Sequence, residues 1–149
     1  MTELEAAYAG LLEAAGRDIL AMSSGAEWGA STVLAHVIAS SRMLAAASAE
    51  LLAGRIPVVD NRPTQSRPYL DAIIQAAGSH AELLETMRKS GLELVILAAQ
   101  LGEGQIATSV PTIILDGTRI RVERPIAFSS LLDPGHIREH LKQLRALPE

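Results

Sequence analysis

The chain contains no cysteine, which excludes disulfides, thiolate metal sites and a cysteine nucleophile. Aromatic side chains are also scarce. They make up 3% of the sequence, and the full set is Tyr8, Trp28, Tyr69 and Phe128. A core with so few rings must be built from Ala, Leu, Ile and Val, and we expect these small and branched residues to pack closely spaced helices.

Lysine is nearly absent, since only Lys89 and Lys142 among the 13 basic residues are lysines. The net charge is −4 and no segment concentrates Lys and Arg, so the sequence lacks the basic face of a nucleic-acid-binding protein. We interpret the preference for arginine over lysine as a sign of a GC-rich coding genome rather than of phosphate recognition. We therefore expect no nucleic-acid partner.

Long apolar runs are missing as well. No uninterrupted apolar stretch reaches the roughly 18 residues of a membrane span. The first ten residues, MTELEAAYAG, are acidic and amphipathic, unlike a secretory signal peptide. We expect a cytoplasmic protein without a membrane partner, built as a single domain over residues 1–149, which is long enough to bury a core.

Four segments show helical periodicity and predict an all-α fold, an up-down-down-up four-helix bundle with a small β-hairpin between helices 3 and 4. The expected helices span residues 2–22, 31–53, 70–101 and about 125–147. Ser31 or Thr32 is expected to cap the second helix, and Pro134 to kink or split the fourth.

Two connections define this topology. Residues 54–69, rich in Pro and Arg, form a loop long enough to run back along a helix, so helices 2 and 3 can be parallel neighbours. Within residues 105–124, the β-rich segments 110–115 and 118–123 flank Asp116 and Gly117, a strong hairpin signal. Two strands alone are marginally stable, so we expect this hairpin to pack on the bundle or on another subunit.

Three of the four histidines have the spacing of a metal site. His136 and His140 are one helical turn apart and share a helix face. His36 lies in the first turns of the second helix. In the topology above, all three fall at the same end of the bundle. Three imidazoles suit zinc, nickel or related ions and leave a coordination position open, as in catalytic sites. The alternative is that the histidines are core or surface polar residues paired by chance.

Other polar residues are weaker candidates for a pocket. His80 lies about ten residues into the expected third helix, roughly 7–9 Å from the level of His36, and is expected to be a partly buried residue or to line a pocket rather than to be a fourth ligand. Trp28 either forms part of the wall of the site or, as a hydrophobic staple, fixes the angle at which the chain enters the second helix. Arg62 and Arg67 either bind an anion from the long loop or are solvated. Asp133 either caps a helix or orients a histidine.

The same residues carry a family resemblance. Residues 28–40, WGASTVLAHVIAS, resemble the Trp-to-His opening of helix 2 in the DinB/YfiT-like superfamily, and residues 131–144, LLDPGHIREHLKQL, resemble its last helix. The resemblance implies a metal-binding four-helix bundle with His36, His136 and His140 as ligands. Pro134 and Gly135 before His136, and the segment 105–124, differ from the family pattern.

The resemblance also implies functions. Members of the superfamily include thiol-dependent transferases and isomerases, similar to maleylpyruvate isomerase, that use mycothiol, bacillithiol or glutathione, and also hydrolases. It implies a divalent metal, a small-molecule substrate and a homodimer. The catalytic group would be a metal-bound water or thiolate, and the arginine-rich composition makes mycothiol the first thiol to test. The alternatives are a non-enzymatic metal-binding or stress-associated protein and a metal-free dimeric bundle.

Overall fold

The computed structural model describes residues 2–16, 29–116 and 119–146. The protein is mostly helical and also contains a three-stranded sheet. In chain order its elements are α1 (Glu3–Ala15), α2 (Ala30–Leu52), β1 (Val59–Asp60), the 3-10 helix η2 (Arg62–Gln65), α3 (Arg67–Ala77), α4 (His80–Gln100), α5 (Glu103–Ile106), β2 (Ser109–Asp116), β3 (Arg119–Ala127), α6 (Phe128–Leu131) and α7 (Gly135–Ala146).

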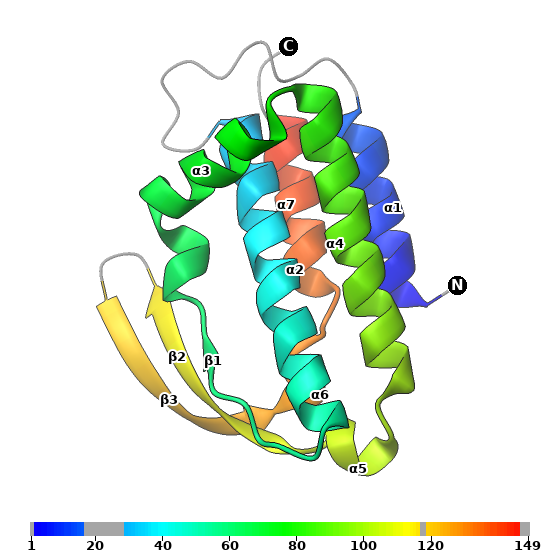
Figure 1. Cartoon of the computed structure of the whole chain (residues 1–149), viewed down its shortest axis with the longest axis vertical. Helices are drawn as coiled ribbons and strands as arrows, with labels where there is room; N and C mark the ends of the chain where they lie inside the picture. The colour runs from blue at the N-terminus through cyan, green and yellow to red at the C-terminus, as the bar shows by residue number, and fades with distance from the viewer. Residues whose placement is uncertain (1, 17–28, 117–118, 147–149) are drawn as a thin grey trace.

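The long helices lie side by side with fixed directions. In Figure 1, α1 and α7 run upward while α2 and α4 run downward. The connection from α2 to α3 returns along the molecule, as the length of the loop 54–69 allows, but it is not the featureless loop that we predicted. It contains β1 and η2, and α3 begins already at Arg67.

Helix α2 forms the centre of the core. Most of its side chains are buried, and the hydroxyls of Ser41 and Ser48 donate back to the carbonyls of Val37 and Leu44, which satisfies polar groups that would otherwise be costly to bury. The helix is long and apolar enough to span a membrane by composition, but 72% of that window is buried inside the protein, as expected of a core helix.

Tyr8 joins three helices. Its ring, on α1, packs against Gly91 of α4, where an added Cβ would lie only 2.7 Å from the ring. Its hydroxyl lies 2.5 Å from that of Ser41 on α2. Gly91, which weakens a helix by propensity alone, is therefore required here by the close approach of the ring.

Several predicted helix boundaries are wrong. The helix expected over residues 70–101 is two helices, because Gly78 adopts a left-handed conformation (φ 79°) and Ser79 caps a new helix by accepting from the N–H of Glu82. Gly29 rather than Ser31 or Thr32 precedes α2. Helix α1 ends at Ala15, with Gly16 as its C-cap, and residues 17–22 of its predicted span lie outside the described residues.

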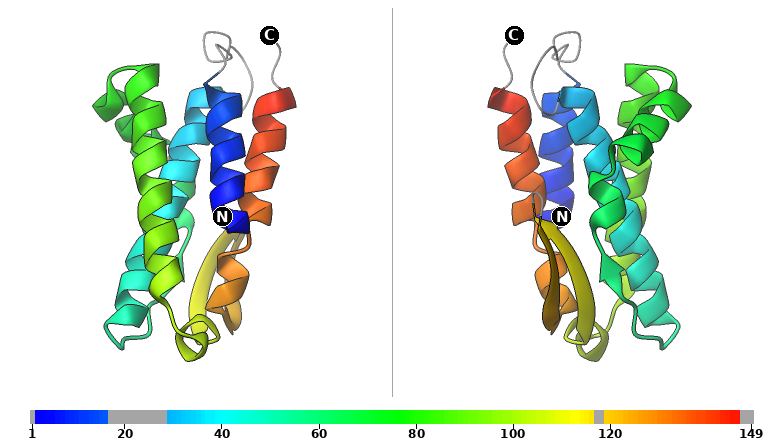
Figure 2. Two further views of the ribbon diagram at one scale, coloured as in Figure 1. Left: turned by 90° about the vertical axis from the view of Figure 1, so that its right-hand side faces the viewer. Right: turned by 90° about the vertical axis from the view of Figure 1, so that its left-hand side faces the viewer.

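The hairpin is part of a larger sheet. β2 and β3 pair antiparallel as predicted, and β1 adds to β2 in parallel, with Val59 opposite Thr112. The side chain of Asn61 extends this pairing, since it accepts from the N–H of Leu115 and donates to its carbonyl. Both views of Figure 2 show the hairpin below the paired helices α1 and α7. Pro125 therefore lies in β3, and the predicted helix start there is wrong.

Candidate metal centre

His36 projects from the second turn of α2 and is 6% exposed. Its Nδ1 lies 2.6 Å from the carbonyl oxygen of Thr64 in η2. A carbonyl oxygen only accepts, so Nδ1 carries the proton and Nε2 carries the lone pair that a metal needs. Thr64 is itself anchored, because its hydroxyl donates to the carbonyl of Asn61, which is tied to the sheet.

The break before α7 positions His136. Pro134 directly precedes the first residue of the helix, Gly135, whose N–H donates to the carboxylate of Asp133 at 2.8 Å. A proline has a fixed φ and cannot donate, which suits a helix start. Pro134 thus separates α6 from α7, one of the two outcomes predicted for it, and Asp133 caps the segment that follows.

His136 and His140 face each other across one turn of α7. Their Nε2 atoms are 3.2 Å apart. Two nitrogens bound tetrahedrally at about 2.0–2.1 Å from one ion are separated by roughly 3.3 Å. The helix therefore already holds the two Nε2 atoms at about the separation that two ligands of one tetrahedral ion would have.

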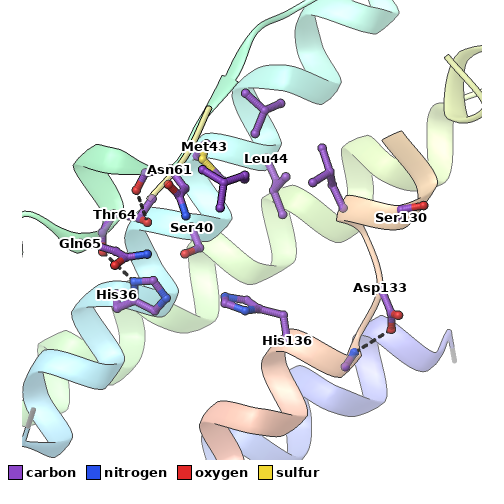
Figure 3. A pocket seen from close by; sticks show the side chains of 14 residues that line it. His36, Ser40, Met43, Leu44, Asn61, Thr64, Gln65, Ser130, Asp133 and His136 are labelled. Atoms are coloured by element: carbon purple, nitrogen blue, oxygen red, sulfur yellow. Dashed lines mark hydrogen bonds between the residues drawn. The ribbon is translucent and has the colours of Figure 1, made fainter. Parts of the chain in front are cut away.

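The structure brings the three predicted ligands together. One ring nitrogen from each of His36, His136 and His140 can be chosen so that all three atoms lie within 4.8 Å of one another. The ring centroids are 4.5 Å apart for the pair on α7 and 4.7 and 5.5 Å from His36 to His140 and His136. Figure 3 shows the rings of His36 and His136 pointing toward each other from facing elements.

A second hydrogen bond fixes the orientation of His140. Its Nδ1 lies 2.7 Å from Oε1 of Gln143, one turn along the same helix. As in His36, Nδ1 carries the proton and donates it, so Nε2 keeps the lone pair that a metal needs. Outer partners of this kind raise the basicity of a ligand and hold its ring. The sequence analysis missed both Thr64 and Gln143. The spacing of Gln143 from His140 is a signal that could have found it, whereas Thr64 acts through its backbone.

The pKa of each imidazole lies below its ordinary value, although His136 is the most exposed of the three. Burial lowers the pKa of His36 against the opposing effect of its bond to Thr64, and burial also lowers the pKa of His136, helped by the nearby His36. Burial lowers the pKa of His140 to about 4, against the hydrogen bond to Gln143. Neutral imidazole is the form that binds a metal, so the cluster does not need to lose protons at neutral pH.

A cavity of about 420 Å³ opens beside the cluster, within the size range of small-molecule sites. Figure 3 shows it between α2, η2 and the start of α7. Its walls come from α2, the β1–η2 segment, β2 and the α6–α7 segment: His36, Ser40, Met43, Leu44, Val59, Asn61, Thr64, Gln65, Ile114, Ser130, Leu131, Asp133, Gly135 and His136.

Three other pocket candidates, His80, Arg62 and Arg67, are not among the described residues that line this cavity. Nε2 of His80 lies 3.1 Å from the carbonyl oxygen of Ala15, and its Nδ1 is buried without a hydrogen-bond partner. His80 is the first residue of α4. We had placed it about ten residues into a helix that starts at residue 70, so the level that we assigned to it rests on a wrong helix start. Trp28 lies outside the described residues.

The two loop arginines are engaged elsewhere. Arg62 forms a two-point ion pair with Asp60. Arg67 donates to the hydroxyl of Thr32 at 3.4 Å and lies 3.8 Å from Asp71. Both side chains are about half exposed.

No protein-family model, no curated protein and no solved structure matches the chain.

Proposed function

We propose that His36, His136 and His140 bind one divalent metal ion, zinc or nickel, and that the protein is a metal-dependent enzyme acting on a small molecule. The observation that carries this proposal is the convergence of three ring nitrogens within 4.8 Å, with two of the rings oriented through their Nδ1 atoms. A core histidine that serves packing alone needs no such arrangement.

The donor set fits the ion. Three neutral nitrogens suit borderline ions such as zinc and nickel, and a site with three protein ligands leaves a position for water or substrate. Such an ion supplies positive charge that lowers the pKa of a water or thiol that it binds. The chain supplies the rest: Thr64 and Gln143 hold the rings, and the cavity gives a substrate access to His36 and His136.

We further propose membership of the DinB/YfiT-like superfamily. The directions of α1, α2, α4 and α7 support an up-down-down-up bundle, and the ligands come from its second and last long helices. The reaction is then a small-thiol transfer or isomerisation, or a hydrolysis. Because the chain has no cysteine, the nucleophile comes from water or from a thiol co-substrate such as mycothiol. Homodimerisation and a cytoplasmic location belong to the same proposal.

Metal analysis of the purified full chain tests the metal site. We expect about one zinc or nickel per chain, and we expect His136→Ala to lose the metal. His80→Ala is the matched control, because it removes a histidine that bonds to Ala15 and not to the cluster. A metal content near zero in the wild type after addition of zinc or nickel contradicts the proposal.

Turnover distinguishes an enzyme from a metal-binding protein without activity. The cavity beside the histidines favours the enzyme, because a purely structural metal site needs no access for a ligand. A screen of the metal-loaded protein with mycothiol, bacillithiol and glutathione against electrophiles, together with hydrolase substrates, is the test. Activity that disappears in His136→Ala and persists in His80→Ala supports the enzyme.

A further inference from the structure

The three-stranded sheet, which lies beside the lower part of α2 in Figure 1, has apolar residues on both faces. Successive residues of a strand point to opposite faces, and along β2 the buried Val110 and Thr112 mark the face turned toward the bundle. The residues that alternate with them form the outer face: Pro111, Ile113 and Leu115. An antiparallel sheet with one face in water normally has polar residues there. β2 instead has the sequence of a strand that is covered on both faces.

The outer face continues onto the segment before β1. Val59 is 1% exposed and pairs with Thr112, so it belongs to the inner face. The side chains of Ile56 and Val58, at alternating positions before β1, are 66% and 61% exposed. By the same alternation both belong to the outer face.

On β3 the register extends the same face. Val122 and Ile120 are the partners of Ile113 and Leu115, and directly opposite residues of an antiparallel pair lie on one side of the sheet. Apolar residue types therefore run across the sheet, from the segment before β1 to β3.

We propose that this outer face, defined by Ile56, Val58, Pro111, Ile113 and Leu115, is the interface of a homodimer, in which it packs against the same face of a second copy. The proposed function includes a homodimer, and this inference rests on that part of it alone and names the surface that forms it. Two sheets packed in this way lie about 10 Å apart and interdigitate their side chains. The hairpin then packs on the bundle with one face and on another subunit with the other.

The charge on this face suits a second copy as the partner. A twofold-symmetric interface sets a patch against its own copy, so an unpaired charge within it would meet a like charge and oppose association. Asp60 is the charged residue that β1 places on the outer face, as the partner of Ile113. Arg62 binds both of its carboxylate oxygens. The described part of the outer face is therefore close to neutral.

The size of the face sets the strength of the dimer. The eight residues of β2 span about 27 Å at ~3.4 Å per residue, and the strands of the sheet, at ~4.8 Å each, cover about 14 Å. The outline is therefore roughly 400 Å², and two copies together bury on the order of 800–1,000 Å², near the lower limit of specific interfaces. We expect a weak dimer, with a dissociation constant in the micromolar range.

Analytical ultracentrifugation of the full chain from about 5 to about 500 µM tests this interface. We expect a concentration-dependent dimer, and Val58→Glu should raise its dissociation constant at least ten-fold, because it sets a charge against its own copy. Ile56→Glu repeats the test at a second exposed position, in case the first variant does not fold. Ile96→Glu is the matched control, because Ile96 is 50% exposed on α4 and not on the sheet.

A chain that stays monomeric over this range overturns the proposal, and so does a dimer that both glutamate variants on the sheet leave intact. A dimer that Ile96→Glu weakens as much as Val58→Glu does also overturns it, although the homodimer of the proposed function then stands. The outer face contains none of the three histidines, so Val58→Glu should keep the metal content of the wild type. Metal analysis of the same samples therefore separates failure of this interface from failure of the metal site.

Discussion

The Nδ1–H of His36 donates to the backbone carbonyl of Thr64 at a distance of 2.6 Å. The bond ties a proposed metal ligand on α2 to a turn that is anchored to the sheet. The orientation of the imidazole therefore depends on residues about 28 positions further along the chain. Because the partner is the backbone carbonyl of Thr64, no substitution of the Thr64 side chain removes this acceptor. A substitution can weaken the bond only by disturbing the residues that hold the turn in place.

Asn61 provides that support and can be tested. Asn61→Ala removes both side-chain bonds to Leu115 and loosens the turn that holds Thr64. We expect a loss of about 1–2 kcal/mol in the free energy of unfolding, and a weaker affinity for zinc, measured by competition with a chromogenic chelator. Thr86→Ala is the control, since it also removes a side-chain bond, but on the exposed surface of α4. An unchanged zinc affinity in Asn61→Ala contradicts the role of the turn.

Gln143 is expected to tune the metal site from the other side. Gln143→Leu removes the acceptor for Nδ1–H of His140, and loss of such an outer partner lowers metal affinity about 10- to 100-fold. Gln143→Glu keeps an acceptor at the same place and should restore most of the affinity. Titration with zinc followed by competition measures both variants. If the leucine variant binds zinc as tightly as the wild type, the hydrogen bond does not orient the ligand.

The stability of the metal-free chain should depend on pH between about 6.5 and 4. Burial lowers the pKa of His140 from 6.5 to about 4, so in this window the unfolded chain binds more protons than the folded chain. Stability is therefore full above pH 6.5 and falls as the pH falls, by at most about 1.4 kcal/mol per pH unit for this residue. Urea unfolding of the chelated protein at several pH values measures the slope.

His140→Gln isolates this contribution from the titration of carboxylates. The variant lacks the titrating group, so its unfolding free energy should change less with pH than that of the wild type across the same window. His80→Gln serves as the comparison for the loss of a histidine outside the cluster. Identical slopes in the wild type and in His140→Gln would show that protonation of His140 does not limit stability.

Gly91→Ala should destabilise the fold. The new Cβ would lie 2.7 Å from the ring of Tyr8, which is held in the core and cannot move aside easily. We expect a loss of about 1–3 kcal/mol, the usual cost of overpacking, although alanine is the better helix former. Gly104→Ala is the control, because an added Cβ there meets nothing within 4 Å. Urea unfolding compares the two, and a stabilised Gly91→Ala contradicts the packing.

Local sequence patterns predicted part of this molecule well. The apolar periodicity of α2 and the spacing of His136 and His140 predicted a buried helix and two histidines on one helix face, because both depend on helical geometry alone. The length of the loop 54–69 correctly allowed α2 and α4 to be parallel. His36 on α2 then meets His136 and His140 on α7, because α7 returns upward and presents them at the level of His36.

The failures have long-range causes. Gly78 and Ser79 split a helix that looked continuous, because the apolar spacing on the two sides agrees by chance while the backbone turns at the glycine. β1 is only two residues long and exists because β2 offers it an edge, which no local pattern reveals. Pro125 was read as a helix start, but it lies in β3 beside a bulge in the register.

The two ends of the proposed metal site are far apart along the chain, since His36 and His136 are separated by 100 positions. An ion bound to both closes a loop of that length, as a disulfide would in a chain that had cysteines. In a chain-entropy model, a cross-link over 100 residues is worth about 4–5 kcal/mol through the unfolded state. The ion would thus be a reversible cross-link between α2 and α7, and a chelator that removes it would lower the free energy of unfolding of the chain.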